Sequence, residues 1–264
     1  MLIALDIDGT VIDYDERLSD KQKIAIQGVI ADGHEVVFAT GRSMAATLPI
    51  IKEIGLKQGY AVACNGAVTF SYSHDKTKII EQVTFNPERA LKALQEVLPQ
   101  ADYAVETKTG DILTSTSFLD RSFGQRVFHV PFEELSQQEV TRLVVRSSQI
   151  PKEDFTHAIE SIGLHGVSYA VGWNAWLDIA PEGVTKASSL EILRRKLGVD
   201  PADTLAVGDG ENDVEMLQWA ARGVAMGQAG DLVRDAAHEL TGTIDEDGLA
   251  QVLNSLSRKS VPKS

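Results

Sequence analysis

The chain has 264 residues, of which 43% are hydrophobic and 24% charged, and this composition predicts one large globular domain or two ordinary ones. The net charge of −13 argues against a general affinity for nucleic acid or anionic membranes, which need clustered Lys and Arg. No segment approaches the roughly 18 apolar residues of a membrane span, and an aspartate at position 6 leaves no room for a secretory signal. With Cys64 as the only cysteine, we expect a cytoplasmic protein without disulfides, and no obligate protein partner is implied.

The first predicted element is a fully apolar strand, residues 2–5, which ends in Asp6-Ile7-Asp8-Gly9-Thr10. Alternate residues of an extended chain share a face, so Asp6 and Asp8 converge. A strand this apolar is typical of a parallel sheet covered on both faces, and ligands bind at the carboxyl ends of such strands. Two acids at that place repel each other unless a cation lies between them.

This run has two simpler interpretations. Asp and Gly are common in tight turns, and that alternative stays open for the run taken alone. A calcium loop would have Asp6, Asp8 and Thr10 at positions one, three and five. It would also need Gly and Glu where the chain has Val11 and Arg17, so a calcium loop is excluded.

Helices and strands alternate in the next segment. Apolar spacing after Ser19-Asp20 predicts a helix over residues 20–33, followed by a strand over residues 35–39. A second helix is predicted before Gly55, and a third strand over residues 60–64. This β-α-β-α-β succession predicts right-handed crossovers and a doubly wound parallel sheet, the α/β fold class.

The pattern changes between about residues 67 and 182, where short β segments separated by turns accompany only two helices, starting at Asn86-Pro87 and Pro151. This mixture predicts an inserted α+β domain over residues 83–182, with residues 1–82 and 183–264 forming the core. The expected β segments cover residues 67–70, 78–83, 103–106, 111–115, 142–146, 167–172 and 175–180. The α/β alternation then resumes with helices over 184–197 and 214–221 and near 230 and 246, and strands over 204–207 and 223–226.

A second acidic run follows the apolar strand at residues 204–207. In Gly208-Asp209-Gly210-Glu211-Asn212-Asp213, Asp209 can complete a cation site with Asp6 and Asp8. Oxygen ligands of this kind suit Mg²⁺ better than Zn²⁺. Asn212 and Asp213 lie one helical step further on, where they can bond phosphate, water or the Lys186 ammonium. An Asx-rich capping turn is the simpler alternative.

Two further segments fit a phosphate site. After the second strand, the Thr40 hydroxyl and the N–H groups of Gly41 and the following helix can hold phosphate oxygens. Lys186, early in its helix, can offer an ammonium to the same anion. Each signal is weak alone, because Thr-Gly also caps ordinary helices and most helix lysines are solvated.

Taken together, Asp6 and Asp8, Thr40-Gly41-Arg42, Lys186 and the 208–213 run resemble the four ordered motifs of the haloacid dehalogenase superfamily. The long insert, with Cys64-Asn65-Gly66-Ala67 ahead of it and Pro181-Glu182-Gly183 after it, resembles the Cof-like sugar-phosphatase branch (type IIB) with its large α/β cap. The resemblance implies a phosphatase of small phosphorylated metabolites, in which Asp6 is the nucleophile that forms an aspartyl-phosphate and Asp8 the general acid and base. It further implies a Mg²⁺ site made by Asp6, Asp8, Asp209 and Asp213. It also implies a phosphate-binding site made by Thr40, Gly41, Lys186 and Asn212.

Residue type suggests the substrate contacts, and two alternative functions stay open. Candidates for substrate contact, chosen by residue type, are Arg42, Asn65, Arg146, Trp173, Asn174 and Trp176. Packing against the cap sheet is an equally good interpretation of the two tryptophans. A hexose phosphomutase of the same superfamily is the nearest alternative function, and it would need a bisphosphate activator. A non-catalytic phosphometabolite sensor is a third, but it predicts decayed motifs, whereas every motif position here is intact.

Overall fold

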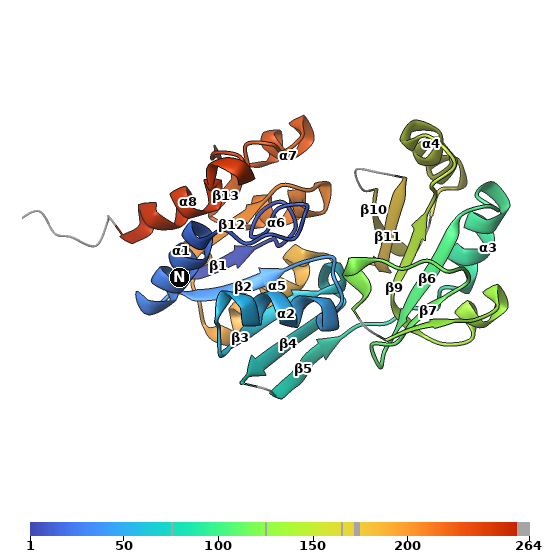
Figure 1. Ribbon diagram of the computed structural model, residues 1–264, viewed down its shortest axis with the longest axis horizontal. Helices are drawn as coiled ribbons and strands as arrows, with labels where there is room; N and C mark the ends of the chain where they lie inside the picture. Colours follow the sequence, from blue (N-terminus) through green and yellow to red (C-terminus); the bar gives the residue numbers. More distant parts are fainter. Residues whose placement is uncertain (75, 125, 165, 172–174, 258–264) are drawn as a thin grey trace, which may run out of the picture.

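Two β-sheets carry the fold in the computed structural model, which describes residues 1–257 apart from 75, 125, 165 and 172–174 (Figure 1). The first sheet has eight strands in the order β14-β13-β12-β1-β2-β3-β4-β5. Their bounds in chain order are β1 Leu2–Leu5, β2 Glu35–Ala39, β3 Gln58–Ala63, β4 Val68–Ser73, β5 Lys76–Gln82, β12 Thr204–Gly208, β13 Arg222–Ala225 and β14 Glu239–Leu240. The second sheet has six strands in the order β10-β11-β9-β6-β7-β8. Their bounds are β6 Asp102–Thr107, β7 Ile112–Thr114, β8 Val127–His129, β9 Val140–Arg146, β10 Val167–Val171 and β11 Trp176–Pro181.

The first sheet is parallel from β14 to β3, as the sequence predicts, and β1 lies between β12 and β2. The two remaining strands, β4 and β5, are antiparallel. The reason is the connection after β3. A short turn, η1 (Cys64–Gly66), follows that strand, and so few residues can reverse the chain but cannot make a parallel crossover. The sheet therefore contains an antiparallel hairpin at the edge that the prediction of a purely parallel sheet did not include.

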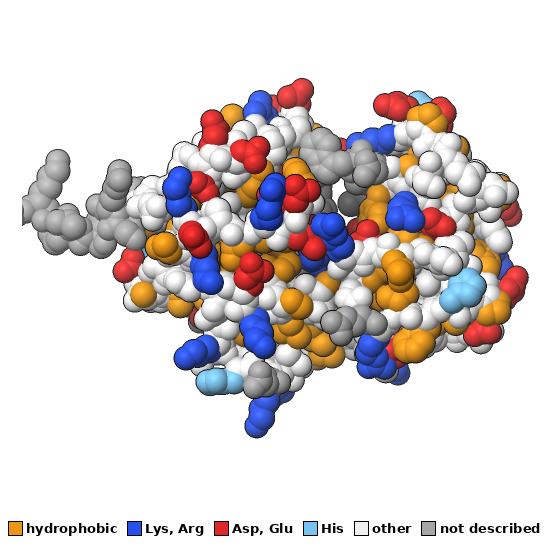
Figure 2. Space-filling view, viewed as in Figure 1, with side chains coloured by type: hydrophobic (Ala, Val, Ile, Leu, Met, Phe, Trp, Pro, Cys, Tyr) orange, Lys and Arg blue, Asp and Glu red, His pale blue; other side chains and the backbone are white. Residues whose placement is uncertain are grey.

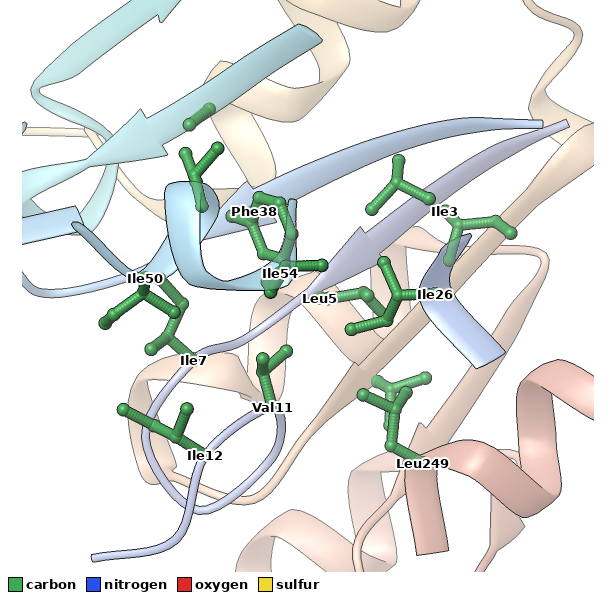
Figure 3. Packing of buried hydrophobic residues seen from close by; sticks show 14 of the residues in the cluster. Ile3, Leu5, Ile7, Val11, Ile12, Ile26, Phe38, Ile50, Ile54 and Leu249 are labelled. Carbon is green, nitrogen blue, oxygen red and sulfur yellow. The ribbon is translucent and has the colours of Figure 1, made fainter. Parts of the chain in front are cut away.

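Helices cover both faces of the first sheet, which confirms the doubly wound arrangement. Residues 3 and 5 of β1 pack with α1, α2 and α8 on one face, where Phe38 and Leu249 also lie (Figure 3). Residues 2 and 4 pack with α5, α6 and α7 on the other face. The helices are α1 Asp20–Ala31, α2 Met44–Ile54, α5 Lys186–Leu197, α6 Val214–Trp219, α7 Asp231–Ala236 and α8 Gly248–Ser257. This alternation explains why every residue of β1 is apolar and buried.

The burial of β1 makes a stability prediction. Leu5 is fully buried in the larger cluster, so Leu5→Ala should lower the free energy of unfolding by about 3 kcal/mol through lost burial and a residual cavity. Ile24 in α1 is 66% exposed, and Ile24→Ala is the matched control with a loss within roughly 0.5 kcal/mol. Urea unfolding of both variants measures the difference. Equal losses of unfolding free energy in the two variants would contradict the burial of Leu5 in this core.

The second sheet is covered by helices on one face only. Helices α3 (Glu88–Val97) and α4 (Lys152–Ile162) pack against it on the side away from the first sheet (Figure 1). On the opposite face lies a small cluster that includes Phe118, Phe123 and Trp176. The strands of this sheet are antiparallel except for the pair β7 and β8. The face that carries this cluster is thus turned toward the first sheet.

Contacts join the two sheets near the start of α2. The Ser43 N–H donates to the Ser122 carbonyl over 2.9 Å, and the Ser43 hydroxyl donates to the Phe123 carbonyl over 3.1 Å. Both acceptors belong to a short turn, η2 (Arg121–Phe123). The buried Cys64 thiol lies 3.2 Å from Glu106 in β6. Among the described helices, none is long and apolar enough to cross a membrane.

Candidate active site

The carboxyl ends of three neighbouring parallel strands gather the acidic side chains. Leu5 pairs with Val207 and with Phe38 in the sheet, so the residues that follow β1, β12 and β2 emerge side by side. The Asp6 N–H donates to the Val207 carbonyl over 3.0 Å and continues this pairing. The strand register alone therefore brings Asp6 and Asp209 to one edge of the sheet.

Lys186 is the centre of a buried ion-pair cluster. Its Nζ lies 2.7 Å from Asp6 Oδ1 and 2.6 Å from Asp213 Oδ1, and its side chain is 1% exposed. The other oxygen of Asp213 accepts the backbone N–H groups of Asp209 and Gly210, each over 3.0 Å. Lys186 begins α5, and Thr185 caps that helix by accepting the Ser188 N–H, which fixes the backbone from which the lysine extends.

Asp209 is held by two residues that the sequence did not point to. Tyr14 donates its hydroxyl to Asp209 Oδ2, and Gln228 Nε2 lies 3.3 Å from the same oxygen. Gln228 also donates to the Gly9 carbonyl over 2.6 Å and so joins the two acidic loops. Neither residue belongs to a motif: Tyr14 follows the first acidic run by four residues, and Gln228 follows β13. Only the tertiary arrangement shows their role.

The crowding of carboxylates changes their protonation. Burial and the nearby Asp213 hold the pKa of Asp6 well above its usual range, even though Lys186 opposes the shift. Burial, with Asp213 again, raises the pKa of Asp209 to about 6. Burial alone would lower the pKa of Lys186, but the charges of Asp213 and Asp6 outweigh it and raise that pKa. The site thus carries more buried negative charge than its one lysine neutralises.

These carboxylates fit a small divalent cation. Asp6, Asp209 and Asp213 each offer an oxygen, and these atoms lie within 4.8 Å of one another. Among the described residues, no hydrogen-bond partner is found for Asp6 Oδ2 or Asp209 Oδ1. Carboxylate oxygens without a protein hydrogen bond, on acids whose pKa values are raised, are what a hard cation with oxygen ligands would satisfy. The Asp8 side chain does not belong to this group.

The Asp8 carboxylate instead faces Arg42. Arg42 Nε lies 2.8 Å from Asp8 Oδ2, and Nη2 lies 2.5 Å from Oδ1. The third guanidinium nitrogen of Arg42, Nη1, pairs with Glu16 Oε1 over 2.8 Å. Arg42 was a candidate for substrate contact, but in this structure the protein's own carboxylates occupy all three nitrogens.

The other predicted phosphate-binding residues also lie at this edge of the sheet. Thr40 follows β2, is fully buried, and its hydroxyl accepts the Arg42 N–H over 3.1 Å. Asn212 Nδ2 donates to Asn65 Oδ1 over 2.9 Å, which ties the fourth motif to the turn after β3. A Cβ at Gly41 would come within 3.3 Å of the Asn65 side chain, so glycine permits their close approach.

A cleft of about 510 Å³ opens over the acids, between the two sheets. On the side of the first sheet, the lining residues are Asp6, Asp8, Tyr14, Glu16, Gly41, Arg42, Asp209, Gly210 and Asn212. On the side of the second sheet, they are Leu119, Asp120, Arg121, Ser122, Arg142, Trp176 and Asp178. A smaller cavity of about 330 Å³ shares Asp178 and Asn212 with it and includes Asn65, Lys186 and Tyr169. Figure 2 shows the molecule hollowed between its two lobes.

The structure brings some of the substrate candidates to the cleft and not others. Trp176 lines it, and its indole Nε1 donates to Asp178 over 2.9 Å. Arg146 lies elsewhere, paired with Asp102 over 3.0 Å and stacked 4.1 Å from the Phe118 ring. Trp173 and Asn174 lie outside the described residues.

From β9, Arg142 lines the cleft, whereas Arg146 was the residue proposed from the sequence for substrate contact. The Arg142 side chain is 3% exposed and pairs with Asp178 over 2.5 Å. Arg142 and Arg146 share a face of β9 because residues four apart in a strand point the same way. The sequence therefore could not show which end of that strand approaches the acids.

The family model of haloacid dehalogenase-like hydrolases matches residues 3–253. The chain belongs to this family. It is 29% identical to the 5-amino-6-(5-phospho-D-ribitylamino)uracil phosphatase YitU of Bacillus subtilis, with 96% of each chain covered. It is 27% identical to the pyridoxal phosphate phosphatase YbhA of Escherichia coli, over 96% of this chain and 97% of that protein.

A solved haloacid dehalogenase structure is similar in fold over nearly the whole chain. It is that of the HAD subclass IIB sugar phosphatase BT4131, with a TM-score of 0.80 and 26% identity, covering 97% of this chain and 98% of that one. These comparisons confirm the resemblance drawn from the motifs and the α/β fold class. They also support the prediction that this haloacid dehalogenase-like hydrolase is a phosphatase.

Proposed function

We propose that this chain is a Mg²⁺-dependent phosphatase that hydrolyses small phosphorylated metabolites, sugar phosphates above all, through an aspartyl-phosphate on Asp6. The observation that carries the proposal is the state of Asp6. It lines the cleft, one oxygen is held by Lys186, and for the other no partner is found among the described residues. A fixed carboxylate with one free oxygen facing a cleft is suited to attack phosphorus. The three relatives compared above act, by their names, on small phosphorylated molecules.

The proposed reaction has two displacements at phosphorus. In the first, Asp6 forms a bond to phosphorus while the bond to the substrate oxygen breaks, and Asp8 gives that oxygen a proton. In the second, Asp8 takes a proton from water, whose oxygen attacks phosphorus and releases Asp6 and inorganic phosphate. Asp8 suits both steps because it is two residues from Asp6 and lines the same cleft.

Bound Mg²⁺ would neutralise charge on the phosphoryl oxygens in both displacements. Asp6, Asp209 and the backbone carbonyl of Asp8 would hold it, with Asp213 in support. Lys186, Asn212, Thr40 and Gly41 would hold the phosphoryl group, since that transition state requires positioning and positive charge. Lys186 is fixed for this role by Asp6 and Asp213 before substrate arrives.

The proposal includes two domains. Residues 1–82 and 183–264 would form the catalytic core, and residues 83–182 a cap that excludes water and sets specificity. The cap would contact the leaving group through Arg142 and Trp176, which line the cleft opposite Asp6. Asn65 would complete the core side of the substrate site. A cytoplasmic location and the absence of nucleic-acid, membrane and obligate protein partners stay predictions.

The experiment that tests the proposal is phosphate release from a panel of sugar phosphates, pyridoxal phosphate, nucleotides and p-nitrophenyl phosphate. We expect release with Mg²⁺, and a loss of at least about 100-fold with EDTA that added Mg²⁺ reverses. A hexose phosphomutase would instead release little phosphate and would convert hexose phosphates only with a bisphosphate activator. A sensor would bind members of the panel and release no phosphate. Either result would overturn the proposal.

A further inference from the structure

The loop between β1 and α1 fixes one acidic residue, Glu16, toward the cleft. Asp13 Oδ1 accepts the N–H groups of Asp15 and Arg17 over 2.9 and 2.8 Å. The Glu16 N–H donates to the Asp13 carbonyl over 2.9 Å. These bonds hold Glu16 at a φ of 64°, a left-handed conformation that costs a non-glycine residue roughly 1 kcal/mol. The Glu16 side chain lines the catalytic cleft.

The Glu16 carboxylate contacts an arginine from each part of the molecule. Its Oε1 lies 2.8 Å from Arg42 Nη1, and its Oε2 lies 3.7 Å from Arg121 Nη1 in η2. Arg42 in turn holds both oxygens of Asp8 through Nε and Nη2. A guanidinium is rigid and planar, so the contact that fixes Nη1 also fixes the two nitrogens that face Asp8.

We propose that Glu16 is a positioning residue for the first chemical step. By holding Arg42, Glu16 sets the orientation of the Asp8 carboxylate. By pairing with Arg121, it links that orientation to the inserted segment, residues 83–182. The inference rests on the proposed function, in which Asp8 takes a proton from solvent on one oxygen, keeps its other oxygen on Arg42, and gives that proton to the departing oxygen. The Asp8 side chain is 44% exposed and Arg42 is 7% exposed, so Arg42 is the rigid element against which Asp8 is aligned.

A merely structural role for Glu16 predicts a different behaviour. The Glu16 side chain is 35% exposed and that of Arg121 65%, and ion pairs this exposed contribute little to stability. If Glu16 only fastened the loop, its replacement would affect all substrates alike. If it positions Asp8, the effect depends on how much the leaving group needs a proton.

The experiment compares Glu16→Gln with wild type on two substrates, p-nitrophenyl phosphate and the best sugar phosphate of the panel. p-Nitrophenolate departs without being protonated, whereas a sugar alkoxide needs the proton. We measure kcat/KM, which covers the steps up to departure of the leaving group. We expect a loss of roughly tenfold or more for the sugar phosphate and less than about threefold for p-nitrophenyl phosphate. Asp15→Asn is the matched control and should match wild type, because Asp15 lies in the same loop and its carboxylate pairs with the exposed Arg17.

Equal losses on both substrates, or no loss on either, would overturn the proposal. Melting temperatures of the variants show whether a loss comes from misfolding, and Glu16→Asp, which keeps the charge, should recover part of the selective loss. Arg121→Ala tests the link to the inserted segment. Its effect should shrink in the Glu16→Gln background, and additive effects would remove Arg121 from the proposal. A wild-type protein inactive on both substrates would refute the phosphatase function itself.

Discussion

Replacing Asp6 by Asn should lower phosphate release by at least about 10⁴-fold on every substrate, because the variant lacks the nucleophile on which the aspartyl-phosphate forms. Asn has nearly the same shape as Asp and can still contact Lys186, so the cleft should keep its form. The measurement is the steady-state rate with saturating Mg²⁺, beside wild type. Residual activity above about 1% of wild type would contradict the assignment of the nucleophile.

The stability of the same variant provides the control. Because burial and the neighbouring acids raise the folded-state pKa of Asp6, its ionised form at neutral pH costs stability that protonation would return. Asn is permanently neutral, so Asp6→Asn should melt no lower than wild type in EDTA. Thermal unfolding at neutral pH measures this. A much lower melting temperature would mean that lost activity reflects lost structure.

Sequence reasoning predicted the elements with strong patterns. The strand at residues 35–39 was predicted with the bounds that the structure shows, and α2 ends at Ile54, directly before Gly55, as expected. The strands β8 and β14, of three and two residues, were missed. The change of pattern at residue 67 comes before the change of sheet, since β4 and β5 still belong to the first sheet. Hairpin strands look alike in sequence whichever sheet they join.

In the candidate site too, some residues could be predicted from the sequence and others could not. The residues that follow parallel strands, such as Asp6 and Asp209, could be placed together because strand direction alone brings them to one edge. Tyr14, Glu16 and Arg142 reach the cleft from loops or from the second sheet, and their contacts depend on how these parts pack. No spacing in the sequence encodes that packing. The contact between Arg42 and Asp8 likewise depends on tertiary packing, and no spacing in the sequence predicts it.

Replacing Lys186 by Met should produce the largest loss of stability of any single change at the site. Lys186 is 1% exposed and stands between Asp6 and Asp213, whose side chains are 7% and 0% exposed. Among the described residues, Lys186 is the only cation that they contact, and its removal leaves buried carboxylates without compensation, which typically costs about 3–5 kcal/mol. We expect that drop in the free energy of unfolding, measured with urea at neutral pH in EDTA. Phosphate release should fall together with it, because the ammonium would also hold the phosphoryl group.

The origin of that loss can be separated from the loss of packing. Lys196→Met, at an exposed position of the same helix, is the matched control and should change stability by less than about 0.5 kcal/mol. If uncompensated charge is the cause, the deficit of Lys186→Met should shrink as the pH falls, because the raised pKa of Asp6 lets a proton neutralise that carboxylate. Added Mg²⁺ should reduce the deficit in the same way, since a divalent cation between Asp6, Asp209 and Asp213 replaces the missing charge. A deficit that ignores both pH and Mg²⁺ would trace to lost packing of the lysine stem and would argue against a cation site at these carboxylates.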